Sequence, residues 1–243
     1  MTGWPRGYAL QRHAELDSTN SQARRLAEAG AGGPVWITAT RQTAGRGRRG
    51  RVWETLDGNL AATLLLRPVK TAAGPAQLSF AAALAVADMA AEAAPGHAVT
   101  VKWPNDVLVD GRKLSGILLE AGQDKSNGDW LAVGIGVNLA AAPDGMAFPA
   151  TSLAALGVRC TPDQALTSIA ARFAHWYDVW MTDGFEPLRA AWLARAEGLG
   201  GPIHARLPHG ERHGLFVGLG PDGALLLDEQ GHTRAITAGE VYF

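Results

Sequence analysis

The spacing of hydrophobic and polar residues predicts a mixture of helices and strands over residues 1–198. Short apolar runs have the length of strands, whereas longer stretches place their apolar residues at a helical period. Strands are predicted at residues 35–39, 60–66, 107–109, 114–119 and 131–137, the last three within a sheet that extends from residue 99 to residue 138. Helices are predicted at residues 22–29, 75–94, 162–181 and 187–196.

Turn and capping residues mark where these elements begin and end. Residues 17–21 are rich in Ser, Thr, Asn and Asp, which cap the first helix, and Thr161 and Gln164 form a capping box for the third. Asp110 and Gly111 predict a two-residue hairpin turn between two apolar runs. The chain up to residue 198 is therefore an α+β domain, in which helices pack on a mixed or antiparallel sheet.

The chain changes character after a glycine-rich stretch at residues 198–202. From Ile203 onwards, short apolar runs alternate with the turn sequences Pro-Asp-Gly and Gln-Gly-His. This pattern predicts a small antiparallel β domain. We expect the first domain to cover residues 1–198 and the second to cover residues 199–243.

Composition excludes several classes of protein. The 243 residues include 22 Lys plus Arg and 23 Asp plus Glu, and a net charge of −1 argues against nucleic-acid binding by bulk electrostatics. A hydrophobic content of 47% is that of an ordinary globular protein. The single cysteine, Cys160, excludes an internal disulfide and a Cys-rich zinc site. No signal peptide or membrane-spanning segment is evident, which predicts a cytoplasmic protein.

Arginines are concentrated in one glycine-rich segment. Five of them fall within residues 41–51, where Gly45, Gly47 and Gly50 allow backbone N–H groups to turn towards a ligand. Guanidinium groups suit phosphate and carboxylate oxygens, so the segment predicts a local anion site. A nucleic-acid contact of the Arg-Gly-Gly kind and a solvated loop are the alternatives. The segment is not a phosphate-binding P-loop, because no Gly-Lys-Ser/Thr follows.

A second cluster surrounds the predicted hairpin. Pro104 interrupts a strand, which predicts that Asn105 and Asp106 are exposed at a turn, where a carboxylate could bind Mg²⁺. Lys113 begins the strand after the hairpin, which is a rigid mount for a charged group. A surface hairpin with solvated charges is the alternative.

A third cluster lies in the apolar run at residues 133–139. Its glycines, Gly134 and Gly136, would let a flat ligand approach a strand, although their spacing is not that of a dinucleotide fingerprint.

The clusters occur in a series that resembles a known family. The series is Ser18-Thr19-Asn20, residues 41–51 followed by Trp53, Lys102-Trp103-Pro104-Asn105-Asp106, and Arg112-Lys113-Leu114-Ser115-Gly116-Ile117-Leu118. It closely resembles the biotin–protein ligases. Residues 223–227 and 238–241 resemble the small SH3-like C-terminal domain of the same family, and the whole resemblance extends from Leu16 to Val241.

The resemblance implies a fold and a two-step reaction. The fold is the catalytic domain of the class II synthetase-like biotin/lipoate ligases, followed by an SH3-like barrel. The reaction first joins biotin to ATP as biotinyl-5′-AMP, with release of pyrophosphate. It then transfers biotin to a lysine of a biotin carboxyl carrier domain of a carboxylase. Mg²⁺ is the implied cofactor.

The resemblance also assigns roles to residues of this chain. Biotin binding is implied for Ser18, Thr19, Asn20, Gln42, Gly45, Arg46, Gly47, Arg48, Lys113 and Gly116. Contacts to ATP or the adenylate are implied for Arg46, Arg48, Trp53, Lys102, Asn105, Lys113 and Asn138. Lys113 and Arg48 are the implied catalytic residues, with Lys113 between the biotin carboxylate and the α-phosphate, and Asp106 is the implied Mg²⁺ ligand.

Other predictions concern partners. Family members that also repress transcription carry an N-terminal helix-turn-helix domain, and too few residues precede Leu16 to form one, so we expect no DNA partner. We expect no membrane partner, and relatives often form homodimers. The competing functions are a lipoate- or octanoate-attaching enzyme, an RNA- or DNA-binding protein, and an inert dimeric scaffold.

Overall fold

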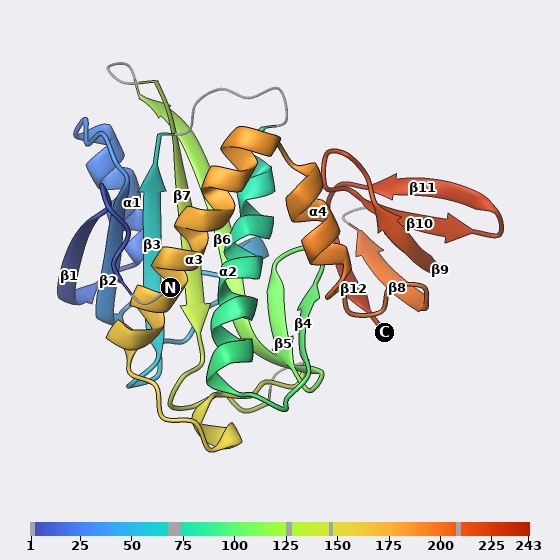
Figure 1. Cartoon of the computed structure of the whole chain (residues 1–243), viewed down its shortest axis with the longest axis horizontal. Helices are drawn as coiled ribbons and strands as arrows, with labels where there is room; N and C mark the ends of the chain where they lie inside the picture. Colours follow the sequence, from blue (N-terminus) through green and yellow to red (C-terminus); the bar gives the residue numbers. More distant parts are fainter. Residues whose placement is uncertain (1–2, 68–73, 125–127, 146–147, 208–209) are drawn as a thin grey trace.

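A large mixed sheet with helices on both faces and a smaller antiparallel sheet make up the computed structural model (Figure 1). The structure describes residues 3–67, 74–124, 128–145, 148–207 and 210–243. The strands of the large sheet are β1 (Ala9–Leu16), β2 (Val35–Gln42), β3 (Leu60–Leu66), β4 (Val99–Lys102), β5 (Asp106–Val109), β6 (Arg112–Asp124) and β7 (Gly128–Val137). The helices are α1 (Thr19–Glu28), α2 (Leu78–Ala93), α3 (Pro162–Asp183) and α4 (Glu186–Leu193). The strands of the small sheet are β8 (Pro202–Leu207), β9 (Gly210–Leu219), β10 (Leu225–Glu229), β11 (His232–Ile236) and β12 (Glu240–Tyr242).

The strand order of the large sheet is β1-β2-β3-β7-β6-β5-β4. The pairing of β1 with β2 is parallel, and every other pairing in this sheet is antiparallel. The hairpin between β5 and β6 turns at Asp110 and Gly111, whose positive φ angles of 48° and 70° are those of a type I′ turn. The predictions of a mixed sheet and of this hairpin are confirmed.

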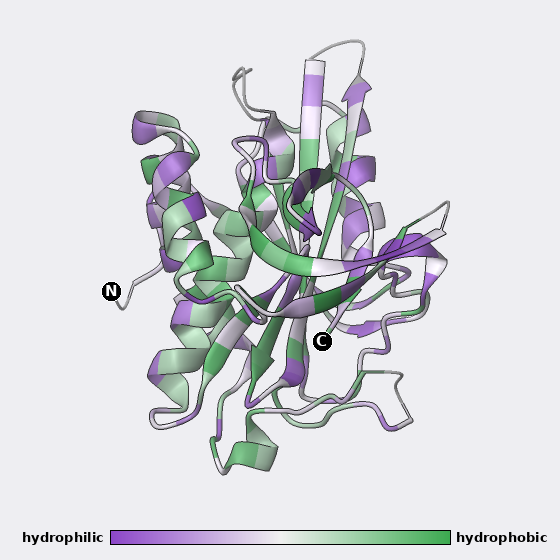
Figure 2. Ribbon diagram, turned by 90° about the vertical axis from the view of Figure 1, so that its right-hand side faces the viewer, coloured by the Kyte–Doolittle hydropathy of each residue, from purple (hydrophilic) through white to green (hydrophobic). Residues whose placement is uncertain are grey.

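Both faces of the central strands are buried. Trp36 and Leu64 point towards α2 and α3, whereas their neighbours Ile37 and Leu65 point towards α1. Because strand side chains alternate between faces, a strand covered on both sides must be apolar throughout, as β3 is apart from Thr63. Figure 2 shows hydrophobic colouring along the strands at the centre of the molecule.

Helix α1 begins three residues earlier than predicted. Its N-cap, Ser18, makes no side-chain capping bond, so the predicted side-chain cap is wrong. The backbone N–H of Thr19 instead donates to Gln42 Oε1 at 2.8 Å, a partner at the end of β2. The Arg25 guanidinium lowers the pKa of Asp17 to about 2 by hydrogen bonding and ties the residue before the N-cap to the second turn of the helix. A tertiary contact therefore satisfies the helix N-terminus in place of a local cap.

Other elements differ from the prediction mainly in length. Strand β2 continues to Gln42 because β1, which the hydrophobic pattern did not predict, pairs with it as far as Leu16. The helix predicted at residues 75–94 begins with a 3₁₀ turn at Pro75–Gln77 and continues as α2. The capping box is confirmed, since the Thr161 hydroxyl accepts from the backbone N–H of Gln164.

The small sheet packs against the edge of the large one. Its strand order is β11-β10-β9-β8-β12, with every pairing antiparallel, as predicted for the tail. Trp103, in the turn after β4, donates through Nε1 to the carbonyl of Gly223 at 3.1 Å. Phe216 of β9 packs edge-on against Trp192 of α4, so the two sheets share one apolar core. None of the helices in the described residues is long and apolar enough to cross a membrane.

The capping box gives a test of the local physics of α3. Thr161→Ala removes the acceptor for the Gln164 N–H, and we expect the free energy of unfolding to fall by about 1 kcal/mol in urea titrations. Thr167→Ala is the matched control, because its hydroxyl only adds a second bond to the helical carbonyl of Asp163. A loss at Thr161 no larger than that at Thr167 would show that the cap contributes nothing.

Candidate active site

A cavity of about 370 Å³ opens on the face of the large sheet that α1 covers only in part. Ala61, Gly134 and Gly136 form its floor, where β3 and β7 continue beyond the contact with α1. Small residues on this face leave space between the strands and the loops above them. Glu240 and Tyr242 of β12 also line the cavity, so the small sheet forms part of its wall.

Hydroxyl and amide groups are gathered at the start of α1. Ser18, Thr19 and Asn20 are 3–4% exposed. Gln42 Oε1 accepts from the Thr19 N–H, and Thr19 Oγ1 lies 3.2 Å from the same oxygen. Gln42 Nε2 donates to Thr55 Oγ1 at 3.0 Å, which fixes the orientation of the Gln42 amide. We call Ser18, Thr19, Asn20 and Gln42 the hydroxyl–amide group.

Asn20 already has partners within the protein. Its Nδ2 donates to Glu120 Oε2 at 2.8 Å, and its Oδ1 accepts from Thr63 Oγ1 at 2.6 Å. A Cβ atom at Gly134 would collide with this amide, so Asn20 packs directly on the backbone of β7. Asn20 also lines the cavity, and its Oδ1 keeps a second lone pair for a ligand, so the predicted contact is compatible with these bonds.

The arginine-rich segment folds as a loop over the cavity. It turns through a short 3₁₀ helix at Arg48–Gly50, and Arg49 and Gly50 have positive φ angles of 56° and 74°. Arg48 Nη1 donates to Asn105 Oδ1 at 3.3 Å, and burial lowers the pKa of the Arg48 guanidinium. Arg51 donates to Glu240 Oε2 at 2.6 Å, which joins the loop to β12. Arg48 is therefore partly withdrawn from water, whereas Arg51 is 63% exposed and held by its ion pair.

The predicted exposure of Asp106 at a turn is wrong. Asp106 begins β5, and its Oδ1 lies 2.7 Å from Lys113 Nζ, with side chains 17% and 23% exposed. The two residues are brought together because β5 and β6 are paired strands of one hairpin. The alternative of a surface hairpin with solvated charges is therefore wrong for this pair. A partly buried ion pair places both charges at the cavity wall.

Lys102 adds a second ammonium group to the cavity. Burial lowers the pKa of Lys102, which is 7% exposed, and Asp106 opposes this effect. Its Nζ lies 3.8 Å from the centroid of the Phe148 ring, a cation–π contact. We call Lys102, Asp106 and Lys113 the charged group.

Trp53 occupies the space above two glycines. A Cβ atom at Gly136 would collide with the indole ring, and one at Gly116 would lie 3.1 Å from Trp53 Cζ3 and 3.3 Å from Lys113 Nζ. The Trp53 N–H donates to the carbonyl of Gly45 at 3.0 Å, which closes the base of the loop. The flat group that approaches β7 here is therefore a side chain of the protein itself.

Two asparagines hold backbone segments in place. Asn105 Nδ2 donates to the carbonyl of Ile117 at 2.6 Å, and Asn138 Nδ2 donates to the carbonyl of Thr151 at 3.1 Å. Asn138 also bridges towards the carbonyl of Lys113, so its amide supports the strand that carries the lysine.

All but one of the predicted site residues line the cavity. The exception is Gly45, which contacts the backbone of Trp53 from outside the lining. The sequence reasoning missed Glu120 and Thr63, which hold Asn20, and it assigned no role to Glu240 or Tyr242. The resemblance of residues 238–241 to a ligase domain was the only signal for β12.

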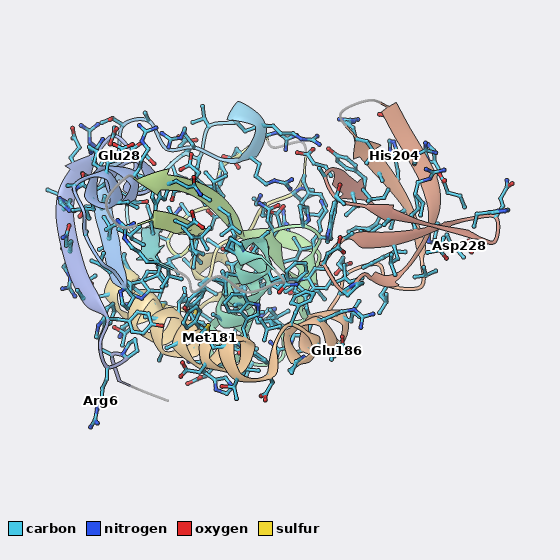
Figure 3. All side chains as sticks on the ribbon, turned by 90° about the horizontal axis from the view of Figure 1, so that it is seen from above. Arg6, Glu28, Met181, Glu186, His204 and Asp228 are labelled. Atoms are coloured by element: carbon cyan, nitrogen blue, oxygen red, sulfur yellow. The ribbon has the colours of Figure 1, made fainter. Side chains whose placement is uncertain are left out.

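A second group of potential metal ligands lies on the small sheet (Figure 3, His204). The ligand atoms of His204, Glu211 and His213 lie within 4.8 Å of one another, but none of the three lines the cavity. Arg206 Nε donates to Glu211 Oε1 at 3.1 Å, so one oxygen of this carboxylate already has a partner. The cavity is the stronger candidate for the active site, because it gathers the residues that the sequence predicted.

The contact between Gly136 and Trp53 can be tested directly. Gly136→Ala should push the indole off β7 and destabilise the fold by about 1–3 kcal/mol, as overpacking does. Hydrogen exchange at the Trp53 amide should become faster, because the base of the loop opens. Gly32→Ala, which has open space around it, is the control. Unchanged exchange and stability in Gly136→Ala would contradict this packing.

Comparisons with known proteins agree with the geometry. Residues 14–138 match the biotin/lipoate A/B protein ligase family, and residues 198–243 match the biotin protein ligase C-terminal domain. The biotin–[acetyl-CoA-carboxylase] ligase of Paracoccus denitrificans is 46% identical, over 95% of this chain and 98% of that protein. The bifunctional ligase/repressor BirA of Bacillus subtilis is 35% identical, over 97% of this chain and 74% of that protein.

Solved structures show the same arrangement. The biotin protein ligase of Aquifex aeolicus in complex with biotin and ATP has a TM-score of 0.82 and 29% identity, over 96% of this chain and 97% of that one. The Leishmania major enzyme in complex with biotinyl-5-AMP has a TM-score of 0.69 and 28% identity, over 96% of this chain and all of that one. The two family matches and the 46% identity over nearly the whole length of a relative show that this chain belongs to the biotin protein ligase family.

Proposed function

We propose that this protein activates biotin with ATP and transfers it to a lysine of a carrier domain. The supporting observation is that one cavity holds both a hydroxyl–amide group suited to a neutral polar ring and a charged group suited to phosphates. The Aquifex aeolicus relative, which has been solved with biotin and ATP, supports the same pair of substrates.

The hydroxyl–amide group binds the ureido ring of biotin. Thr19 and Gln42 offer oxygens whose positions are fixed by the bond to the N-terminus of α1, and Ser18 adds a hydroxyl beside them. Gly45, Arg46 and Gly47 belong to the loop that wraps the ligand. Gly116 lets the ureido ring come close to the backbone of β6. Prepositioned polar groups favour this ring over an apolar one, because they would be left unpaired otherwise.

Lys113 bridges the biotin carboxylate and the α-phosphate. A carboxylate oxygen of biotin attacks the α-phosphorus and forms an O–P bond. The bond between the α-phosphorus and the oxygen that bridges the α- and β-phosphates breaks, and pyrophosphate leaves. Two anions must approach one another, so a fixed ammonium group at this point lowers the barrier. Arg48 contacts the same phosphate, Trp53 offers an aromatic face to adenine, and Lys102, Asn105 and Asn138 lie on the nucleotide side.

Asp106 is the proposed holder of Mg²⁺. Mg²⁺ is usually bound through one or two carboxylates together with substrate phosphates, and Asp106 supplies a carboxylate in the cavity beside the phosphate-binding cations. When bound, Mg²⁺ would neutralise charge on the ATP phosphates. Asp106 meanwhile orients Lys113 through their ion pair.

The second step needs a protein partner. The uncharged amine of a carrier lysine attacks the acyl carbon of biotinyl-AMP, an amide bond forms, AMP leaves, and the amine loses a proton. The name of the Paracoccus denitrificans relative supports acetyl-CoA carboxylase as the source of the carrier domain. Homodimerisation, a cytoplasmic location and the absence of DNA and membrane partners stay predictions.

We also infer a division into a catalytic domain at residues 1–198 and a small β domain at residues 199–243. Its support is that α4, the last helix, ends at Leu193 and that the small sheet begins at Pro202. The match of residues 198–243 to a separate family domain agrees with this boundary.

The proposal predicts biotin-dependent exchange between ATP and pyrophosphate. Purified protein with biotin and Mg-ATP should also yield biotinyl-AMP by mass spectrometry. Lipoate should support little exchange, because it lacks the ureido ring that pairs with the hydroxyl–amide group. Equal exchange with lipoate would reject the biotin assignment, and no exchange with either acid would reject the activity.

Lys113→Ala should slow adenylation strongly. Loss of one charge-stabilising donor costs on the order of 2.7–4 kcal/mol, or roughly 10²–10³ in rate. Transfer from supplied biotinyl-AMP should fall less, since the anhydride already exists. Lys113→Arg should restore only part of the rate, because a planar guanidinium does not replace a compact ammonium. Adenylation at the parental rate in Lys113→Ala would remove Lys113 from the mechanism.

A further inference from the structure

Glu120 lies behind the hydroxyl–amide group, on β6, seven residues after Lys113. Its Oε2 accepts from Asn20 Nδ2 at 2.8 Å, and both of its oxygens lie 3.2 Å from Arg46 Nη2. One carboxylate thus contacts α1 and the arginine loop at the same time. Glu120 is absent from the cavity lining, which separates it from the residues that would touch a ligand.

The carboxylate fixes the direction of the Asn20 amide. An ionised carboxylate only accepts hydrogen bonds, so the NH₂ of Asn20 must face Glu120 and its Oδ1 must face Thr63. The Thr63 hydroxyl then donates to Asn20 at 2.6 Å and leaves its own oxygen as an acceptor towards Thr19. A flipped amide would set Asn20 Oδ1 against the Glu120 carboxylate, and its NH₂ would then donate to Thr63 and reverse the direction of the next hydrogen bond.

The chain of hydrogen bonds ends inside the cavity. Thr19 Oγ1 lies 2.8 Å from Thr63 Oγ1 and 3.2 Å from Gln42 Oε1, and both Thr19 and Gln42 line the cavity. Thr63 is 0% exposed, so no water is available to replace a lost partner. The charge on Glu120 therefore determines which oxygens of the hydroxyl–amide group are free to accept bonds from a ligand.

Arg46 gives the same carboxylate a second effect. Its Nη1 donates to Ser21 Oγ at 2.8 Å, while Nη2 contacts Glu120, so the guanidinium bridges α1 and β6. The two side chains are 38% and 36% exposed, and an ion pair at that exposure contributes little by itself. Its value here is geometric, because it holds the start of the loop against the helix that carries the hydroxyl–amide group.

We infer that Glu120 is a positioning residue for biotin: its carboxylate orients the Asn20–Thr63–Thr19 hydrogen bonds and holds the Arg46 loop against α1. This inference rests on the proposed function, because it assigns the hydroxyl–amide group to biotin. It also gives Asn20 an indirect role, through Thr63, beside the predicted contact with the ligand. Glu120 contacts none of the three residues of the charged group and reaches the phosphate side only through Arg46, so biotin binding should depend on it more strongly than ATP binding does.

The test measures biotin binding and kinetics in variants of Glu120. Glu120→Ala removes both contacts, and the loss of hydrogen bonds to a charged group should raise the Kd for biotin, measured by calorimetry without ATP, roughly 10- to 100-fold. The KM for biotin should rise in parallel, and it should rise more than the KM for ATP, because Glu120 reaches the phosphate side only through the Arg46 loop. Glu120→Gln keeps an acceptor for Asn20, so its Kd for biotin should lie between those of the parent protein and Glu120→Ala.

A matched control separates positioning from general stability. Glu92→Gln removes the carboxylate charge from another ion pair, that of Glu92 with Arg172 on α2 and α3, and should leave biotin binding unchanged. Because Glu120→Gln preserves size, it stays informative if Glu120→Ala does not fold. An unchanged Kd for biotin in Glu120→Gln and Glu120→Ala, or equal increases in the KM values for biotin and ATP, would overturn the inference.

A double-mutant cycle tests the path through Thr63. Thr63→Val removes the hydroxyl while keeping the shape, and its effect on the biotin Kd should be strongly non-additive with that of Glu120→Gln. Additive effects would show that the two residues act separately, and they would reject the path of hydrogen bonds from Glu120 through Asn20 to Thr63. Failure of the parent protein to bind biotin would instead reject the proposed function, so the two failures are distinguishable.

Discussion

The large sheet must bury both of its faces, and the helix on one face is too short to cover it. Helices α2 and α3 extend along one side, whereas α1 has ten residues and covers only part of the other. Apolar strand surface cannot be left open to water without cost. In this protein, loops cover the remainder, and Gly116, Gly134 and Gly136 keep the strand surface low enough for side chains and a cavity to fit between.

This constraint explains why the site is assembled from distant parts of the chain. The loop after β2, the hairpin of β5 and β6, and the last strand of the small sheet all meet over the same uncovered surface. The hydroxyl–amide group combines the start of α1 with Gln42 of β2, and a hydrogen bond joins the two. The charged group comes from the edge of the sheet, where the Lys113 side chain reaches Asp106 on the neighbouring strand of a hairpin.

Local signals in the sequence predicted the parts that depend on neighbouring residues. Asp110 and Gly111 determined a turn, Thr161 and Gln164 determined a helix start, and the apolar run of β3 determined a buried strand. The start of α1 was mispredicted because its partner, Gln42, is 23 residues away. The ion pair of Asp106 with Lys113 was missed for a related reason. A hairpin can be predicted from its turn, but whether its charges are buried depends on what packs above it.

The bond between Arg51 and Glu240 joins residues that are 189 positions apart in the chain. During synthesis the arginine loop is therefore made long before its anchor, Glu240. Strand β12 can pair with β8 only after residues 240–242 have been made. Helix α1, the central strands and the β5–β6 hairpin have all left the ribosome by then. The wall of the cavity is thus completed later than its floor, and a nascent chain carries an open, unfinished site until Tyr242 has been made.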